Sequence, residues 1–371
     1  MNSQRNIGVA SAAGSYLVVE LTNRCNLRCV HCAVADPDHP HHAQQAGSLN
    51  PALFESVLHD LEAVDGHFDN LIMFWLGEPL LHPNFGRIYR SALRSAVRFQ
   101  TFLKLEVHTN AVPLTLQRRR DLLNSAVVPQ VLHFSLDASC RETYLRVKGR
   151  DQFDDAIQNA EQFIIEQTQL GARWPRPVFQ FIVGSNNVAD IPDFVAHWTA
   201  VCSRAGRDAR LAAGHVPPGE DPVLFFRQLD CPTAAEQERE NALFRKAMTE
   251  LGLELPPQAA QGEQVLAENT TACSGFWKSP VLDWTGKLTA CTRDNHLLNS
   301  LGNVADSPFS ELWWGEQMLQ RRNQVSKGCY DGLELCTTCF IPRSLNHSEL
   351  SESEIADYRE QQVAGGLRVW S

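Results

Sequence analysis

The sequence predicts an α/β protein, a partial, open (β/α)6 barrel followed by a small cysteine-rich domain. Two observations predict this fold class. Short apolar, β-rich runs alternate with helical patterns between residues 16 and 216, which is typical of βαβ units and a parallel sheet. Most of the eleven cysteines form two groups, one near each end of the chain. Two such groups predict two metal sites, of which the second lies beyond the barrel.

Six apolar runs supply the predicted strands of the barrel. They are Tyr16–Leu21, Leu71–Leu76, Leu103–Thr109, Gln130–Leu136, Val178–Gly184 and Leu211–Val216. Helical patterns lie between them, at Pro51–Val64, Leu114–Ser125, Gln152–Leu170 and Ile191–Ala205. Because six units are fewer than the eight of a closed (β/α)8 barrel, we expect a partial barrel over residues 1–216.

The rest of the chain divides by composition into three parts. Pro217, Pro218 and Gly219 mark the predicted end of the barrel. Residues 217–270 are predicted as a helical bridge and a polar linker, residues 271–345 as the cysteine-rich domain, and residues 346–371 as a C-terminal helix and tail.

Charge and hydropathy exclude several classes of protein. The chain has 33 Lys and Arg against 43 Asp and Glu, a formal net charge of −10, and this is a poor match for nucleic acid or an anionic membrane. No apolar stretch is long enough to cross a bilayer, and residues 1–15 have no signal-peptide pattern. We therefore expect a cytoplasmic protein that binds neither nucleic acid nor membrane.

The first cysteine group is Cys25, Cys29 and Cys32, directly after the first predicted strand. In barrel enzymes the loops after the strands carry the active site. Three thiolates in this spacing hold three irons of a [4Fe–4S] cluster and leave the fourth iron open for a ligand. A structural zinc site is the alternative, but it normally needs four ligands, and the nearest fourth candidate is His31.

This CxxxCxxC motif resembles that of the radical S-adenosylmethionine (SAM) superfamily, and further motifs follow in the family's order. Leu76-Gly77-Glu78-Pro79 resembles its GGEP motif, with leucine in place of the first glycine. The resemblance implies that SAM is bound by Gly77, Glu78, Pro79, Thr109, Asn110, Ser135 and Asp137. It also implies that the cluster cleaves SAM to a 5′-deoxyadenosyl radical, which takes a hydrogen atom from the substrate. An electron donor such as flavodoxin or ferredoxin is expected.

The second cysteine group resembles the SPASM/twitch extension of that superfamily. It contains Cys273, Cys291, Cys329, Cys336 and Cys339, and Gly286 lies five residues before Cys291. Five cysteines are fewer than the seven usual for a full SPASM domain, which favours a twitch form with one auxiliary [4Fe–4S] cluster. The expected ligands are Cys273, Cys291, Cys336 and Cys339, with Cys329 a spare or alternative ligand. A structural zinc ribbon is the alternative.

The resemblance favours a radical SAM enzyme that abstracts hydrogen from a carbinol carbon of a sugar or aminocyclitol. The cysteine spacing is similar to that of an aminocyclitol dehydrogenase from antibiotic biosynthesis, so we expect dehydrogenation or epimerisation. The alternative is a maturase that crosslinks, oxidises or epimerises a ribosomally made peptide. We rank it second because only 15 residues precede the first predicted strand, whereas maturases often carry a leader-binding domain there.

Epimerisation would require a hydrogen-atom donor, usually a thiol. Cys231, after the sixth predicted strand, is the first choice, and Cys140 the second. Cys202 lies in a helical pattern and is interpreted as a buried structural thiol. His215 ends the sixth predicted strand and is a candidate proton acceptor. Glu106, inside the third predicted strand, is expected to pair with a neighbouring polar group.

Overall fold

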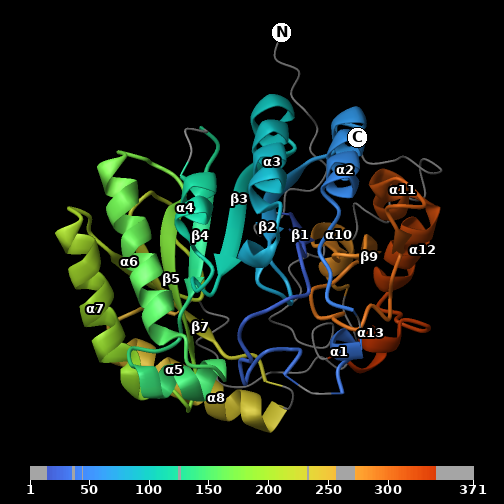
Figure 1. Ribbon diagram of the computed structural model, residues 1–371. Coiled ribbons are helices and arrows are strands. Elements are labelled where there is room, and N and C mark those ends of the chain that lie inside the picture. Colours follow the sequence, from blue (N-terminus) through green and yellow to red (C-terminus); the bar gives the residue numbers. More distant parts are fainter. Residues whose placement is uncertain are drawn as a thin grey trace.

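The computed structural model describes residues 15–35, 38–43, 45–123, 127–231, 234–255 and 272–339 (Figure 1). The predicted linker at 258–270 and the predicted C-terminal helix and tail at 346–371 lie outside the described residues.

One ten-stranded sheet runs through the described chain, in the order β10-β9-β8-β1-β2-β3-β4-β5-β7-β6. Its strands are β1 (Tyr16–Val19), β2 (Phe68–Met73), β3 (Phe102–Thr109), β4 (Gln130–Ser135), β5 (Arg176–Val183), β6 (Arg210–Ala213), β7 (Val223–Gln228), β8 (Val281–Leu282), β9 (Lys287–Thr289) and β10 (Gly302–Asn303). The strands from β1 to β7 pair in parallel. The predicted α/β class, with a parallel sheet followed by a cysteine-rich domain, is confirmed.

The described helices are α1 (Pro40–Ala43), α2 (Pro51–Ala63), α3 (Phe85–Phe99), α4 (Leu116–Leu122), α5 (Arg141–Lys148), α6 (Phe153–Gln169), α7 (Ile191–Arg204), α8 (Ala234–Glu250), α10 (Gly275–Lys278), α11 (Phe309–Trp314), α12 (Glu316–Val325) and α13 (Glu334–Thr338), with short 3-10 turns at Pro79–Leu81 and Val188–Asp190. Of these, α2, α3, α4, α6 and α7 cover one face of the parallel strands (Figure 1). Within the described ranges, no helix is both long and apolar enough to cross a membrane.

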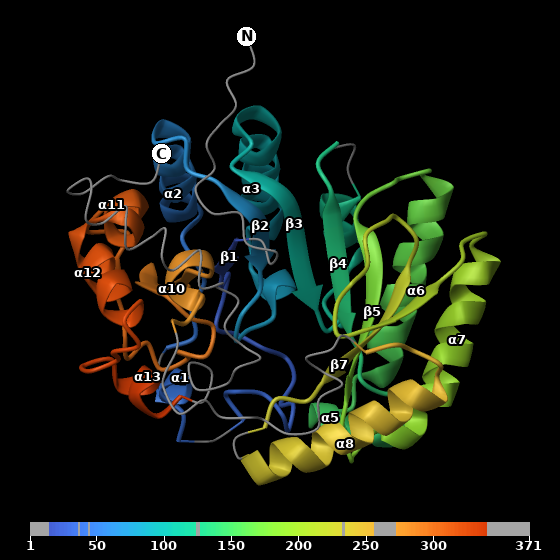
Figure 2. The ribbon, with the colours of Figure 1, turned by 180° about the vertical axis from the view of Figure 1, so that it is seen from behind.

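The core lies between the sheet and these helices. Successive strand side chains point to opposite faces, so every second residue of β3 and β4, such as Leu105, Val107, Leu132 and Phe134, packs into this core. The residues between them lie on the other face of the sheet, which we call the inner face. Figure 2 shows the strands from that side.

The sheet contains a strand that the sequence analysis missed. β7 lies inside residues 217–270, predicted as bridge and linker, and it pairs with β5 and β6. We interpreted the proline–glycine cluster at 217–219 as the end of the barrel, but it belongs to the turn between β6 and β7. Arg176 holds this turn through the carbonyl oxygens of Asp221, at 2.6 Å, and Pro217, at 2.5 Å. The sheet therefore continues beyond residue 216, and the predicted domain boundaries stay predictions.

The cysteine-rich segment extends the sheet at its other end. β8 pairs in parallel with β1, and β9 pairs antiparallel with both β8 and β10. Gly47 packs against the indole of Trp284, where an added Cβ would come within 2.0 Å of the ring. Because β8 pairs with β1, the segments that carry the two cysteine groups belong to one hydrogen-bonded sheet.

Candidate active site

The loop that follows β1 carries the first cysteine group. Cys25, Cys29 and Cys32 are all half-buried. Backbone bonds from Arg28 and Val30 to the C-terminal end of α5, both at 3.0 Å, hold the loop in place. Burial, with a further contribution from the charge of Glu78, raises the pKa of the Cys25 thiol to about 12. Thiolates in such a site need a positive partner, and three soft sulfur donors fit an iron–sulfur cluster.

The Gly77-Glu78-Pro79 segment packs directly against this cysteine loop. A Cβ on Gly77 would lie 1.9 Å from the carbonyl oxygen of Thr22, so only glycine fits there. The backbone N–H of Glu78 donates to the carbonyl oxygen of Arg24 at 2.8 Å. The second loop is thus fixed against the first by backbone contacts.

The buried carboxylate of Glu78 contacts two other predicted SAM-binding residues. It accepts hydrogen bonds from the Thr109 hydroxyl at 2.7 Å and from the Asn110 backbone N–H at 2.8 Å. The Asn110 amide in turn donates to Asn26, between the cluster cysteines, at 2.9 Å. Desolvation raises the pKa of Glu78 to about 7, although these hydrogen bonds oppose the change. The ends of β2 and β3 and the cysteine loop therefore form one connected site.

Asp137 is placed differently from Ser135. Ser135, at the end of β4, lies on the inner face. Asp137 is fully buried, and its carboxylate accepts from Lys148 Nζ at 2.5 Å and from the backbone N–H of Ile182 at 2.7 Å. His31, the fourth ligand that a zinc site would need, has its Nε2 3.8 Å from the same carboxylate. Contact between Asp137 and SAM stays a prediction, and the geometry assigns its carboxylate to Lys148, which the sequence analysis missed.

The second cysteine group separates four thiols from the fifth. Burial, and then the charges of neighbouring thiols, raise the pKa values of Cys273 and Cys336 to about 12. In both cases Cys291 and Cys339 are among these neighbouring thiols. The Sγ atom of Cys329 instead lies 3.5 Å from the Asp331 carboxylate, and the side-chain amide of Gln324 donates to it at 3.8 Å. The four predicted ligands thus gather at one place, and this donor set fits a fully ligated iron–sulfur cluster.

Four other residues from the sequence analysis have the following positions. Cys231 follows β7, is 9% exposed, and its backbone N–H donates to Gln237 at 2.9 Å. Cys140 is exposed at the start of α5, and its thiol lies 3.5 Å from the Thr143 hydroxyl. His215 is exposed in the turn after β6. Cys202 is fully buried on α7, as expected for a structural thiol. Roles for Cys231, Cys140 and His215 in the reaction stay predictions.

The inner face also carries three residues that we call the lumen triad: Glu106, His108 and His133. Atoms of their side chains lie within 4.8 Å of one another. His133 was not among the residues predicted from sequence, and only a contact with a neighbouring polar group was expected for Glu106. The available signal was the polar side chains at alternate positions of β3 and β4, which place them on one face.

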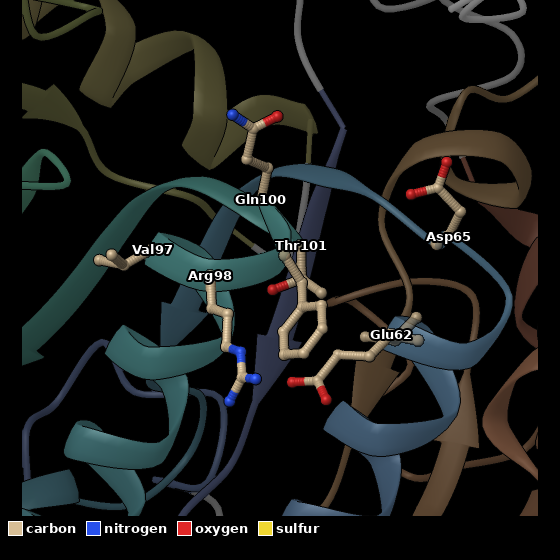
Figure 3. A pocket seen from close by; sticks show the side chains of 9 residues that line it. Glu62, Asp65, Val97, Arg98, Gln100 and Thr101 are labelled. Atoms are coloured by element: carbon tan, nitrogen blue, oxygen red, sulfur yellow. The ribbon is translucent and has the colours of Figure 1, made fainter.

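A hollow of about 230 Å³ lies at the opposite edge of the sheet (Figure 3). It is lined by the ends of α2 and α3 and the residues before β3: Leu61, Glu62, Asp65, Gly66, Val97, Arg98, Phe99, Gln100 and Thr101. Because enzymes of this barrel type place their chemistry at the carboxyl ends of the strands, and this hollow contains no cysteine, we do not assign the reaction to it.

Comparison with known families identifies both parts of the chain. The Radical SAM superfamily matches residues 19–165, and the SPASM iron–sulfur cluster-binding domain matches residues 273–340. The chain is a radical SAM enzyme with a SPASM domain. When bound, its first cluster and SAM supply radical chemistry, and the SPASM domain supplies an auxiliary iron–sulfur centre. The number of auxiliary clusters stays a prediction.

Two curated relatives cover most of this radical SAM enzyme. The tungsten-containing aldehyde ferredoxin oxidoreductase cofactor-modifying protein of Pyrococcus furiosus is 23% identical over 347 residues, which cover 88% of this chain and 87% of the relative. The mycofactocin maturase MftC of Mycobacterium tuberculosis is 25% identical over 320 residues, covering 84% of this chain and 74% of the relative.

Solved structures support the same fold. The structure of anSMEcpe with bound AdoMet has a TM-score of 0.56 at 14% identity, covering 94% of this chain and 97% of that chain. Streptococcus suis SuiB bound to its precursor peptide SuiA has a TM-score of 0.53 at 13% identity, covering 90% of this chain and 75% of that chain. BtrN in complex with AdoMet and 2-DOIA has a TM-score of 0.46 at 14% identity, covering 92% of this chain and 99% of that chain.

Proposed function

We propose that this radical SAM/SPASM enzyme is a maturase that abstracts a hydrogen atom from a residue of a peptide substrate. The observation that carries the proposal is the match to mycofactocin maturases. Proteins of this name from Mycobacterium ulcerans, Mycobacterium tuberculosis and Mycolicibacterium smegmatis are 23–25% identical to it and cover 80–84% of the chain. The proposal therefore replaces a sugar or aminocyclitol, our first expectation, with the alternative from the sequence analysis.

The inner face offers suitable contacts for a peptide. Gln180 on β5 lies opposite Ser135, and its amide nitrogen is 3.5 Å from the Ser135 hydroxyl. Arg227 on β7 is exposed. Amide, hydroxyl and guanidinium groups can bond the carbonyl oxygens and N–H groups of a peptide. They lie on the face of the sheet that also carries Ser135, which is one of the predicted SAM-binding residues.

The test uses anaerobically reconstituted enzyme with SAM and a reductant. Two panels would be compared: synthetic precursor peptides and free sugars or aminocyclitols. We expect a peptide to stimulate 5′-deoxyadenosine formation and to change its own mass, with both effects lost in Cys25→Ala. Turnover of a sugar or aminocyclitol, with every peptide inert, would refute the proposal and restore our first expectation.

A further inference from the structure

The lumen triad is built by the register of two adjacent strands. Leu105 and Val107 pack into the helix-covered core, so Glu106 and His108 lie on the inner face. His108 pairs directly opposite His133 of β4, which brings two histidines from different strands together. Their rings stack with centroids 4.0 Å apart and planes 19° apart.

Aromatic rings hold this histidine pair on both sides. Phe74, just after β2, stacks on His108 with centroids 5.2 Å apart and planes 7° apart. On the other side Phe225 of β7 meets His133 edge-on at 6.3 Å. The two imidazoles are therefore packed between Phe74 on one side and Phe225 on the other, and this packing limits their rotation.

Glu106 is the only carboxylate of the triad, and three basic side chains surround it. Its Oε2 lies 3.4 Å from His108 Nε2 and 3.7 Å from His133 Nε2, and its Oε1 lies 2.5 Å from Lys104 Nζ. Burial alone would raise the pKa of Glu106, but the hydrogen bond from His108 and the neighbouring positive groups lower it below its usual range. Glu106 is thus ionised and accepts the Nε2–H of His108, which leaves Nδ1 of His108 as a bare acceptor.

A metal ion does not fit the triad as it is arranged. Histidine binds a metal through a lone pair in the plane of its ring. Because the His108 and His133 rings are stacked, one ion cannot lie in both ring planes. Lys104 also contacts the carboxylate that would have to bind the ion. The arrangement instead resembles a base whose tautomer is fixed by a carboxylate.

Two buried polar atoms beside this base have no partner among the described residues. They are Nδ1 of His133 and Oε1 of Gln180, and both side chains are 4% exposed. Buried polar atoms are normally hydrogen-bonded, so such a pair indicates a place where a ligand's polar group belongs. Burial, and then the charge of His108, lower the pKa of His133 well below its usual value, and Arg227 acts in the same direction. His133 therefore stays neutral, and the contact of His108 Nε2 with Glu106 leaves Nδ1 of His108 as the atom that can accept a proton.

We propose that the lumen triad binds a hydrogen-bond donor of the substrate, a hydroxyl or an amide N–H, and that Nδ1 of His108 accepts its proton. The bond from hydrogen to the substrate oxygen or nitrogen breaks, an N–H bond forms at His108, and the electron pair stays on the substrate. Glu106 positions the ring and balances its new charge, and Arg227 on β7 favours the negative charge left on the substrate. The inference deepens the proposed function and rests on it for the substrate class.

The first arm of the test needs no substrate. Nitrogen NMR of ¹⁵N-histidine-labelled holoenzyme would compare wild type with His108→Gln, Glu106→Gln and the exposed control His59→Gln. The His108 signals of wild type are identified as those that disappear in His108→Gln. We expect them to show the Nε2–H tautomer near neutral pH, and we expect Glu106→Gln to lose the preference of His108 for this tautomer. An Nδ1–H tautomer in wild type would overturn the inference. So would a non-iron metal bound at one per chain in wild type and absent from His108→Gln.

The second arm uses whichever substrate is turned over. We expect His108→Gln to lower product formation about 100-fold or more, to lower the product formed per 5′-deoxyadenosine, and to lose the acidic limb of the pH profile. Glu106→Gln should shift that limb, and His59→Gln should match wild type. Product formation by His108→Gln within about threefold of wild type, with the same pH profile, would overturn the inference. If no peptide reacts but His108 shows the expected tautomer, the proposed peptide substrate is wrong, and the role of His108 as proton acceptor is still supported.

Discussion

Replacing Glu20 by glutamine tests how the barrel is joined to the cysteine-rich domain. Glu20 directly follows β1, is 3% exposed, and its backbone N–H donates to the carbonyl oxygen of Leu282 in β8 at 2.9 Å. Burial, and then the nearby charge of Asp283, raise the pKa of Glu20 from 4.5 to about 8. Glu20 is therefore protonated at neutral pH in the folded protein but ionised in the unfolded chain.

The direction of the pH effect follows from this difference. Below pH 4.5 both states hold the proton, and the full contribution to stability is present. As the pH rises toward 8 the unfolded chain releases the proton first, so the folded protein loses about 1.4 kcal/mol per pH unit. Between about pH 5.5 and pH 8 the loss reaches about 3 kcal/mol as an upper limit. Glutamine does not titrate and removes this loss.

The assay is denaturant unfolding of wild type and Glu20→Gln across that pH range under anaerobic conditions. We expect the variant to gain stability over wild type steadily as the pH rises. The exposed Glu311→Gln is the matched control and should follow wild type throughout. A difference between Glu20→Gln and wild type that is constant with pH, or that shrinks as the pH rises, would refute the reasoning.

Three further predictions address the cofactor sites. Gly77→Ala should lower SAM-dependent 5′-deoxyadenosine formation about 100-fold, because its Cβ would lie 1.9 Å from a carbonyl oxygen of the cysteine loop. Lys148→Met should lower the free energy of unfolding by about 3–5 kcal/mol, measured with denaturant, because the buried charge of Asp137 would lose its positive partner and keep only the N–H of Ile182; adding Asp137→Asn should recover part of that loss. Cys329→Ser should keep the wild-type iron content, whereas Cys336→Ser should lose about four irons per chain by iron analysis.

The grouping of the cysteines could be predicted from sequence because its signal is local. Cys25, Cys29 and Cys32 lie within eight residues, directly after a strand with a clear apolar pattern. The position of a loop after a strand already places it at the site edge of a parallel sheet. Likewise Glu78 and Asn110 follow predicted strands, and the structure brings them together.

Features that depend on strand register could not be predicted in this way. The pairing of His108 with His133 depends on how β3 aligns with β4, and neither strand's sequence fixes that alignment. β8 has two residues, too few to show any periodicity, so its pairing with β1 left no signal. The turn between β6 and β7 was misinterpreted because proline and glycine mark tight turns and domain ends alike.

The parallel pairing of β8 with β1 has a consequence for electron flow. The backbone N–H groups of Val18 and Glu20 donate to the carbonyl oxygens of Pro280 and Leu282, both at 2.9 Å. To swing away, the SPASM segment would have to break these bonds and expose the apolar contact of Val18 with Val281. Electrons that pass between the two thiol groups would thus cross between segments that one hydrogen-bonded sheet holds together.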